Sequence, residues 1–200
     1  MILINGHVID LVFGFVTVAI ALGLSYVFLL TLLSRTRQKI WVPRSYREGD
    51  PSVIFVIPCL NEEAVIEASL QRLLAMDYPD LHILVIDDGS DDDTAQIVRG
   101  LDAPQIHLLQ RHLPNARLGK GEALNAAFAH IRAGNLCDVS DPENVLIVVV
   151  DADGRMEPDS LRYVIPAFED PTLGGVQIGV RINNRTNNLL ARMQDMEFVL

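Results

Sequence analysis

The sequence predicts an α/β domain, built as a mostly parallel sheet sandwiched by helices and preceded by one transmembrane helix. Half of the 200 residues are hydrophobic, and the excess of apolar residues lies near the amino end. Beyond residue 50, short runs that are apolar at every position alternate with segments of helical periodicity. This alternation is typical of buried parallel strands joined by crossover helices.

The first predicted element is a membrane anchor over residues 1–34. Residues 11–33 carry no charge, and a helix of this length spans about 34 Å, enough to cross a bilayer. A cleaved signal peptide is the alternative. It is disfavoured because no Lys or Arg precedes the run, the run is too long, and no Ala-x-Ala-like site follows it.

A basic juxtamembrane linker is predicted next, over residues 35–50. Its basic side chains are Arg35, Arg37, Lys39, Arg44 and Arg47. They predict a cell (inner) membrane protein whose amino terminus lies outside, whose following domain lies in the cytoplasm, and whose Trp41 lies at the interface. Two cysteines without CxxC spacing fit a reducing compartment.

The remaining domain, residues 51–200, is acidic. Residues 50–200 hold 24 acidic and 11 basic side chains, which argues against nucleic acid as the main partner. Strands are expected over residues 53–57, 81–86, 106–109, 145–150 and, with interruptions, 176–182. Helical faces are expected within residues 66–74, 124–131 and 161–168. Ligands of such sheets bind beyond the carboxyl ends of the strands.

Acidic segments follow three of these strands: residues 58–63 (PCLNEE), 87–94 (DDGSDDDT) and 151–154 (DADG). Each has an ordinary interpretation. Asn61 could cap a helix, Asp91 to Asp93 could begin one, and residues 151–154 could form a turn. Together, three acidic loops at one sheet edge would repel one another unless a cation is present. Mg²⁺ or Mn²⁺, held by carboxylates and a diphosphate, would resolve that conflict.

Two other phosphate-binding motifs are missing from the sequence. Residues 119–122 (GKGE) lack the upstream Gly and the Ser or Thr of a Walker A loop, and no GxGxxG follows the first strand. Phosphates would therefore be held through the metal. Lys120, at the start of a predicted helix, could face either a ligand or solvent.

Four ordered motifs, residues 58–63, 87–94, 119–125 and 151–153, resemble glycosyltransferase family 2 of the GT-A fold over residues 51–200. Residues 174–177 (GGVQ) are followed by further polar side chains in a pattern similar to membrane-bound polysaccharide synthases of the poly-N-acetylglucosamine, chitin and hyaluronan type. Those side chains are Arg181, Asn188, Gln194 and Glu197.

The resemblance implies an inverting transferase that moves a sugar from a nucleotide sugar, expected to be a UDP-sugar, to a polysaccharide or lipid-linked acceptor. It places Asp151 and Asp153 in catalysis, with Asp153 binding Mg²⁺ or Mn²⁺ and Asp151 contacting the nucleotide sugar beside Ala152. The nucleotide pocket would also be lined by Pro58, Leu60 and Glu62, with Ile86 and Asp88 at the base and ribose and Lys120 on the donor side.

One feature departs from the family. The family's general base lies beyond the segment that resembles residues 174–198, whereas this sequence stops at Leu200. Asp195 and Glu197 are assigned to structure or to an acceptor channel. The alternative expectation is therefore a catalytically incomplete nucleotide-sugar-binding fragment that needs a further segment or a partner. A membrane-tethered signalling receiver is disfavoured because its acidic pair would follow the first strand.

Overall fold

The computed structural model describes residues 6–36, 42–136 and 144–179. The chain divides into two compact units, one made of residues 1–40 and 176–200, and the other of residues 41–175. Each unit is described by itself.

The first unit contains α1 (Gly6–Thr36). Its segment Asp10–Leu33 has a mean hydropathy of 2.4, and by length and composition it could cross a membrane. The hydroxyl groups of Thr17 and Thr31 donate to carbonyl oxygens four residues earlier, so they are satisfied within the helix. The predicted helix is therefore confirmed, and its insertion in a bilayer stays a prediction.

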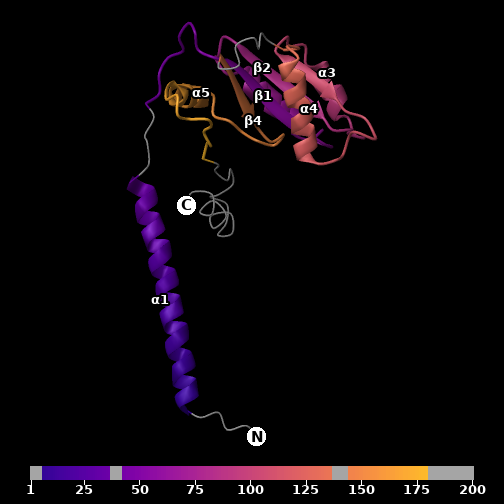
Figure 1. The fold of residues 1–200 in the computed structure, drawn as a ribbon. Coiled ribbons are helices and arrows are strands. Elements are labelled where there is room, and N and C mark those ends of the chain that lie inside the picture. The colour runs from indigo at the N-terminus through magenta and orange to yellow at the C-terminus, as the bar shows by residue number, and fades with distance from the viewer. Residues whose placement is uncertain (1–5, 37–41, 137–143, 180–200) are drawn as a thin grey trace. The chain divides into compact units, whose positions relative to one another are not determined.

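The second unit is built on a parallel sheet of β1 (Ser52–Cys59), β2 (Leu81–Asp87), β3 (Ile106–Gln110) and β4 (Val145–Val149). The strand order is β3-β2-β1-β4. The chain therefore adds strands on one side of β1 and then crosses to its other side to form β4 (Figure 1). This reversal creates a topological switch point between β1 and β4, the place where open α/β sheets bind ligands.

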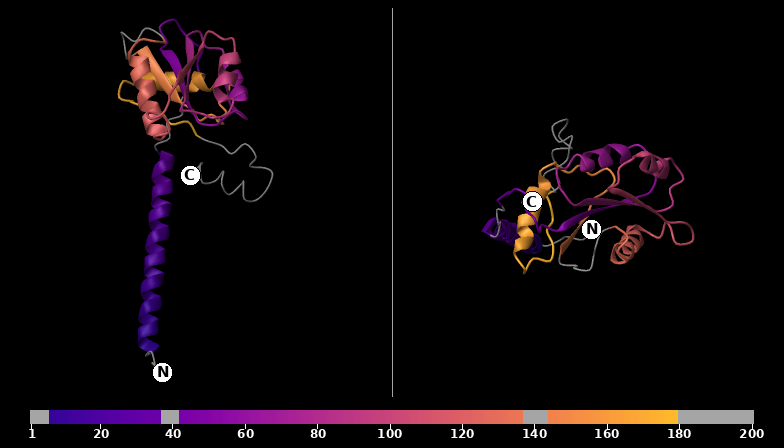
Figure 2. Two further views of the ribbon diagram at one scale, coloured as in Figure 1. Left: turned by 90° about the vertical axis from the view of Figure 1, so that its right-hand side faces the viewer. Right: turned by 90° about the horizontal axis from the view of Figure 1, so that it is seen from above.

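Helices cover both faces of the sheet (Figure 2). On one face, α2 (Ile66–Leu74) and α3 (Thr94–Gly100) pack with the buried side chains of Phe55 and Ile83. On the other face, α4 (Lys120–Arg132) packs on Ile54 and Leu84. The strand residues alternate between these two cores because successive side chains point to opposite faces.

The structure differs from the sequence prediction at the edge strand β4. Ile147 and Val149 are 37% and 50% exposed, although the prediction had every strand covered on both faces. Both side chains are in register with Ile54 and Val56 of β1, so they lie on the α4 face. The helix α4 contacts β1 and β2, and β4 lies beyond its reach at the sheet edge.

Two other predicted elements also change. Residues 176–179 are not in a strand, while residues 180–182 lie outside the described residues, as do Arg181, Asn188, Gln194, Asp195 and Glu197. The helix expected over residues 161–168 is split into α5 (Ser160–Val164) and the 3₁₀ helix η2 (Ile165–Glu169). Pro166 explains the split because its nitrogen cannot donate the α-helical hydrogen bond.

Residues 42–50 pack on the domain, where the sequence predicted a linker. The Arg44 guanidinium donates two hydrogen bonds to Asp50, at 2.9 and 2.5 Å, and one to Glu169 at 2.9 Å. Its side chain is only 16% exposed, so it is engaged by carboxylates and is not presented to lipid headgroups. The side chain of Arg47 is 66% exposed. Arg37, Lys39 and Trp41 lie outside the described residues.

Candidate functional site

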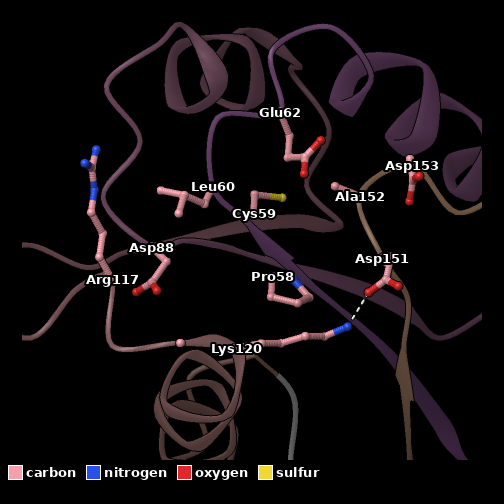
Figure 3. Close-up of a pocket in the computed structure, with 11 residues that line it drawn as sticks. Pro58, Cys59, Leu60, Glu62, Asp88, Arg117, Lys120, Asp151, Ala152 and Asp153 are labelled. Carbon is pink, nitrogen blue, oxygen red and sulfur yellow. Dashed lines mark hydrogen bonds and ion pairs between the residues drawn. The ribbon is translucent and has the colours of Figure 1, made fainter.

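A cavity of about 450 Å³ opens at the carboxyl edge of the sheet (Figure 3). The ends of β1, β2 and β4 and the start of α4 contribute its walls, so it lies at the switch point of the strand order. Its lining residues are Pro58, Cys59, Leu60, Glu62, Asp88, Arg117, Gly119, Lys120, Asp151, Ala152 and Asp153.

The structure brings together eight of the nine residues that the sequence singled out. They are Pro58, Leu60, Glu62, Asp88, Lys120, Asp151, Ala152 and Asp153. Ile86 is the exception. Its side chain is fully buried in the core beneath α4, because its position in β2 directs it to that face of the sheet. It supports the floor of the site and does not line the cavity.

Two loops at one side of the cavity are tied together by side-chain to backbone hydrogen bonds. The N–H of Asn61 donates to Ser90 Oγ at 3.0 Å, and Asn61 Oδ1 accepts from the N–H of Asp91 at 3.0 Å. The N–H of Glu62 donates to Thr94 Oγ1 at 2.8 Å. Asn61 therefore joins the β1–α2 and β2–α3 loops and does not cap α2, which begins at Ile66.

Glu63 and Asp92 complete this connection. The N–H of Glu63 donates to Asp92 Oδ2 at 3.1 Å, and the N–H of Asp93 donates to Glu63 Oε2 at 3.0 Å. Asp92 Oδ1 also accepts from the N–H of Thr94 at 3.0 Å, at the start of α3. The prediction that these acids serve the start of a helix is thus confirmed for Asp92, and bonds across the two loops hold the wall that carries Leu60 and Glu62.

Asp88 forms an ion pair at the bottom of the same wall. Its Oδ1 lies 2.5 Å from Arg111 Nη1, and the two side chains are 8% and 10% exposed. The neighbouring Asp87 is also buried, and it accepts hydrogen bonds from the N–H of Ser90 and from Gln110 Nε2, both at 2.8 Å. Both oxygens of Asp87 and one oxygen of Asp88 therefore have partners within the chain, as burial requires.

Asp151 and Lys120 form a second ion pair, across the mouth of the cavity (Figure 3). Lys120 is the first residue of α4, and Gly119 precedes it with φ +103°, a conformation that favours glycine. Lys120 thus faces the site, which answers the question that the sequence left open. Its partner side chain is 66% exposed, so solvent screens the pair and a ligand can compete for either group.

The loop after β4 is fixed from below by α2. Ser69 Oγ donates a hydrogen bond of 2.6 Å to the carbonyl oxygen of Ala152, and both residues are buried. Gly154 closes the loop through its N–H, which donates to Asp151 O at 2.8 Å. A Cβ at Gly154 would lie 2.7 Å from Val150 Cγ1, so this tight turn requires glycine. The loop therefore holds Asp151 and Asp153 on a rigid support.

The carboxylates do not converge on one point, as the acidic loops suggested they would. Among the described residues, no group of three His, Cys, Asp or Glu side chains is arranged to hold a metal ion. Asp88 and Asp151 are instead neutralised by Arg111 and Lys120. The repulsion expected between three acidic loops is thus relieved by cations of the chain itself.

Glu62 and Asp153 are different. Their carboxylates line the cavity and make no hydrogen bond or ion pair with any described residue. A divalent cation such as Mg²⁺ usually takes one or two carboxylates and completes its shell with phosphate oxygens and water. The donor set present therefore fits a metal that arrives with a diphosphate, and Asp153 is available to bind it.

Cys59 lines the cavity as an inert wall. Its side chain is 2% exposed, and burial, assisted by nearby carboxylates, raises the pKa of its thiol to about 12. A thiol with a raised pKa is not a nucleophile at neutral pH.

Sequence reasoning missed the two arginines of the site, Arg111 and Arg117. The Arg117 guanidinium donates to the carbonyl oxygen of Gly89 at 3.0 and 2.7 Å and lies 3.1 Å from Asp91. The sequence did contain a signal for them: an acidic site needs positively charged counter-ions, and both arginines lie in the loop before α4. Their partners could not be chosen without the fold.

Comparison with known proteins gives a consistent result. The family model for glycosyl transferase family 2 matches residues 54–199. The chain is 34% identical over 154 residues to a beta-monoglucosyldiacylglycerol synthase from Synechocystis sp., covering 75% of this chain and 30% of the relative. It is 27% identical over 156 residues to a poly-beta-1,6-N-acetyl-D-glucosamine synthase from Staphylococcus epidermidis, covering 78% of this chain and 34% of the relative.

A solved structure is similar in fold. It is the mannosyltransferase PcManGT from Pyrobaculum calidifontis, in complex with GDP-Man and Mn²⁺, with a TM-score of 0.61 and 28% identity. The match covers 86% of this chain and 49% of that chain. The chain spans about a third of the length of the two curated relatives.

Proposed function

The chain belongs to glycosyltransferase family 2, and from this premise we propose that its cavity binds a nucleotide sugar, with a UDP-sugar as the donor. The observation that carries the proposal is the gathering of eight predicted donor-site residues around one cavity at the switch point of the sheet. The sugar would pass to a polysaccharide or to a lipid-linked acceptor, with inversion at the anomeric carbon.

The cavity can hold the two ends of such a donor on different walls. Asp88 lies at the end of β2, where the base and ribose would bind. Lys120 lies at the start of α4, and Asp151 and Asp153 lie just after the end of β4, where the diphosphate and sugar would bind. The Lys120 ammonium, now beside Asp151, carries the positive charge that a diphosphate attracts.

A divalent metal, Mg²⁺ or Mn²⁺, is part of this proposal, with Asp153 as its ligand from the chain. When bound, the metal would stabilise the negative charge that develops on the leaving diphosphate. Two observations support it: the carboxylates of Glu62 and Asp153 have no partner among the described residues, and the PcManGT complex contains Mn²⁺.

The membrane and the acceptor belong to the same proposal. The helix α1 would anchor the protein in the cell (inner) membrane, with the second unit in the cytoplasm. One relative is named for a glucosylated diacylglycerol and another for a polysaccharide, which supports a lipid or a glycan as the acceptor class.

Donor binding tests the proposal directly. The full chain, purified in detergent, is titrated with UDP-glucose and UDP-N-acetylglucosamine by calorimetry, with Mn²⁺ and with a chelator. Asp153→Asn is expected to weaken metal-dependent binding about 10- to 100-fold, as loss of a metal-binding group does. Asp102→Asn, which removes an exposed carboxylate outside the cavity, should leave binding unchanged. Tight binding that needs no metal would contradict the site assignment.

A transfer assay separates the two functional alternatives. The same chain is incubated with labelled UDP-sugar and with vesicles that contain diacylglycerol or a glycan primer, and release of UDP is measured. Release that depends on the acceptor supports a complete transferase. Binding without release supports a donor-binding chain that needs a further segment or a partner.

A further inference from the structure

The environment of Asp88 is asymmetric. Arg111 Nη1 lies 2.5 Å from Asp88 Oδ1, whereas Asp88 Oδ2 makes no hydrogen bond or ion pair with any described residue. Asp88 lines the cavity, so a ligand meets a carboxylate that has one oxygen hydrogen-bonded to a guanidinium and lying beside its positive charge.

Arg111 is held firmly in this position. It directly follows β3, and its backbone N–H donates to Asp87 O at 2.9 Å, which continues the ladder between β2 and β3. Its Nη2 donates to the carbonyl oxygen of Asn115. The backbone N–H and both terminal nitrogens of Arg111 are thus engaged within the chain. The side chain is only 10% exposed, so solvent screens its contact with Asp88 little.

This arrangement distinguishes between nucleobases. Guanine presents two adjacent N–H donors, which pair with both oxygens of a carboxylate. Uracil presents one N–H donor between two carbonyl oxygens. At Asp88, a second donor directed at Oδ1 would meet the hydrogens of the Arg111 guanidinium, which are positive as well, and like charges repel. One donor directed at Oδ2 meets no such obstacle.

Arg117 is a further arginine among the residues that line the cavity. Its guanidinium is 41% exposed and extends away from the Asp88 carboxylate in Figure 3. Its Nε and Nη2 donate to Gly89 O, and Nη2 also lies 3.1 Å from Asp91 Oδ2. Arg117 is therefore engaged by the loop after β2, and the selection of the base is assigned to Asp88 and Arg111.

We propose that Arg111 is a positioning residue that selects uracil over guanine, because its hydrogen bond to one oxygen of Asp88 places positive hydrogens where the second donor of guanine would bind. The proposal rests on the proposed donor site and adds a determinant of nucleobase specificity. The fold alone does not set this specificity, because the structurally similar PcManGT is in complex with GDP-Man.

The test is competition between free nucleotides. The full chain in detergent with Mn²⁺ is titrated with UDP and with GDP, and the ratio of the two dissociation constants is measured for each variant. The parent protein should prefer UDP at least about 10-fold. In Arg111→Met this ratio should fall to within about 3-fold, because UDP loses its fixed acceptor and GDP gains the second oxygen. Arg111→Lys, which keeps a cation beside Asp88, should retain at least half of the ratio.

Controls make the outcomes distinct. Arg72→Met removes an exposed arginine on α2 outside the cavity and should leave the ratio unchanged. If Arg111→Met does not fold, Arg111→Gln takes its place, with the same loss of selectivity expected. If the variant binds UDP and GDP more weakly by the same factor, Arg111 is merely structural, and the inference is overturned. A parent protein that binds neither nucleotide would overturn the donor site itself.

Discussion

Ser69 provides a sharp test of how the fold supports the site. Its hydroxyl group donates a 2.6 Å hydrogen bond to Ala152 O, and the two residues are 5% and 3% exposed. In Ser69→Ala the carbonyl oxygen stays buried without this donor, which costs about 1–3 kcal/mol. Alanine recovers about 0.5 kcal/mol through its higher helix propensity. We therefore expect a net loss of about 1–2 kcal/mol.

Two measurements check this value. Chemical unfolding of the full chain in detergent should give a lower midpoint with an unchanged slope. Hydrogen exchange should show faster exchange for the amides of residues 151–154, by about tenfold if local opening becomes easier by 1.4 kcal/mol. Metal-dependent donor binding should weaken as well, because Asp151 and Asp153 flank the released carbonyl.

Ser160→Ala is the matched control. Its hydroxyl group also donates to a carbonyl oxygen, that of Glu157 at 2.7 Å, but this bond is exposed. Water can replace the lost donor there, so the change should stay within about 0.5 kcal/mol. Equal stability and equal exchange in Ser69→Ala and Ser160→Ala would refute the claim that α2 fixes the loop after β4.

Three further changes test the domain around the site. Arg44→Met should lower the free energy of unfolding by about 2–4 kcal/mol because Asp50 is left buried without its cation. The hydrogen bond from Arg44 also lowers the pKa of Asp50. In urea unfolding at a series of pH values, the stability of the parent protein should therefore fall below about pH 4, and the variant should lose less stability over the same range. Gly89→Ala should cost at least about 1–2 kcal/mol of stability in thermal unfolding, because the φ of Gly89 is +84° and the new Cβ would lie 3.0 Å from the Cβ of Ala116. Gly100→Ala is the control and should cost nothing, because open space surrounds Gly100. In a background without the other cysteine, the Cys59 thiol, whose pKa burial raises to about 12, should react with iodoacetamide only on unfolding; rapid labelling of the folded chain would contradict its assignment as an inert wall.

Local sequence patterns were sufficient to predict the layers of the fold and the edge of the sheet that carries the site. Uniformly apolar runs predicted the four parallel strands of the sheet, since strands buried by crossover helices contact apolar groups on both sides. The interrupted run over residues 176–182 predicted a fifth strand, but its described part, residues 176–179, is not in a strand. The acidic segments after three strands had to meet at one edge, because parallel strands end on the same side of a sheet. The one described strand with an exposed face, β4, was wrongly expected to be covered, since strand order is not encoded in a local run.

Tertiary structure alone decided how the charges of the site are paired. Asp88 and Arg111 lie on neighbouring strand ends, Ser69 and Ala152 are 83 residues apart, and Arg44 meets Glu169 across 125 residues. Such partners are brought together by helix and sheet packing, which spacing along the chain does not report. Composition and periodicity determined which elements form and where the acids gather. The packed fold determined which carboxylates are neutralised within the chain and which, like that of Asp153, stay open to a ligand, because an ion pair depends on the distance in space between its groups.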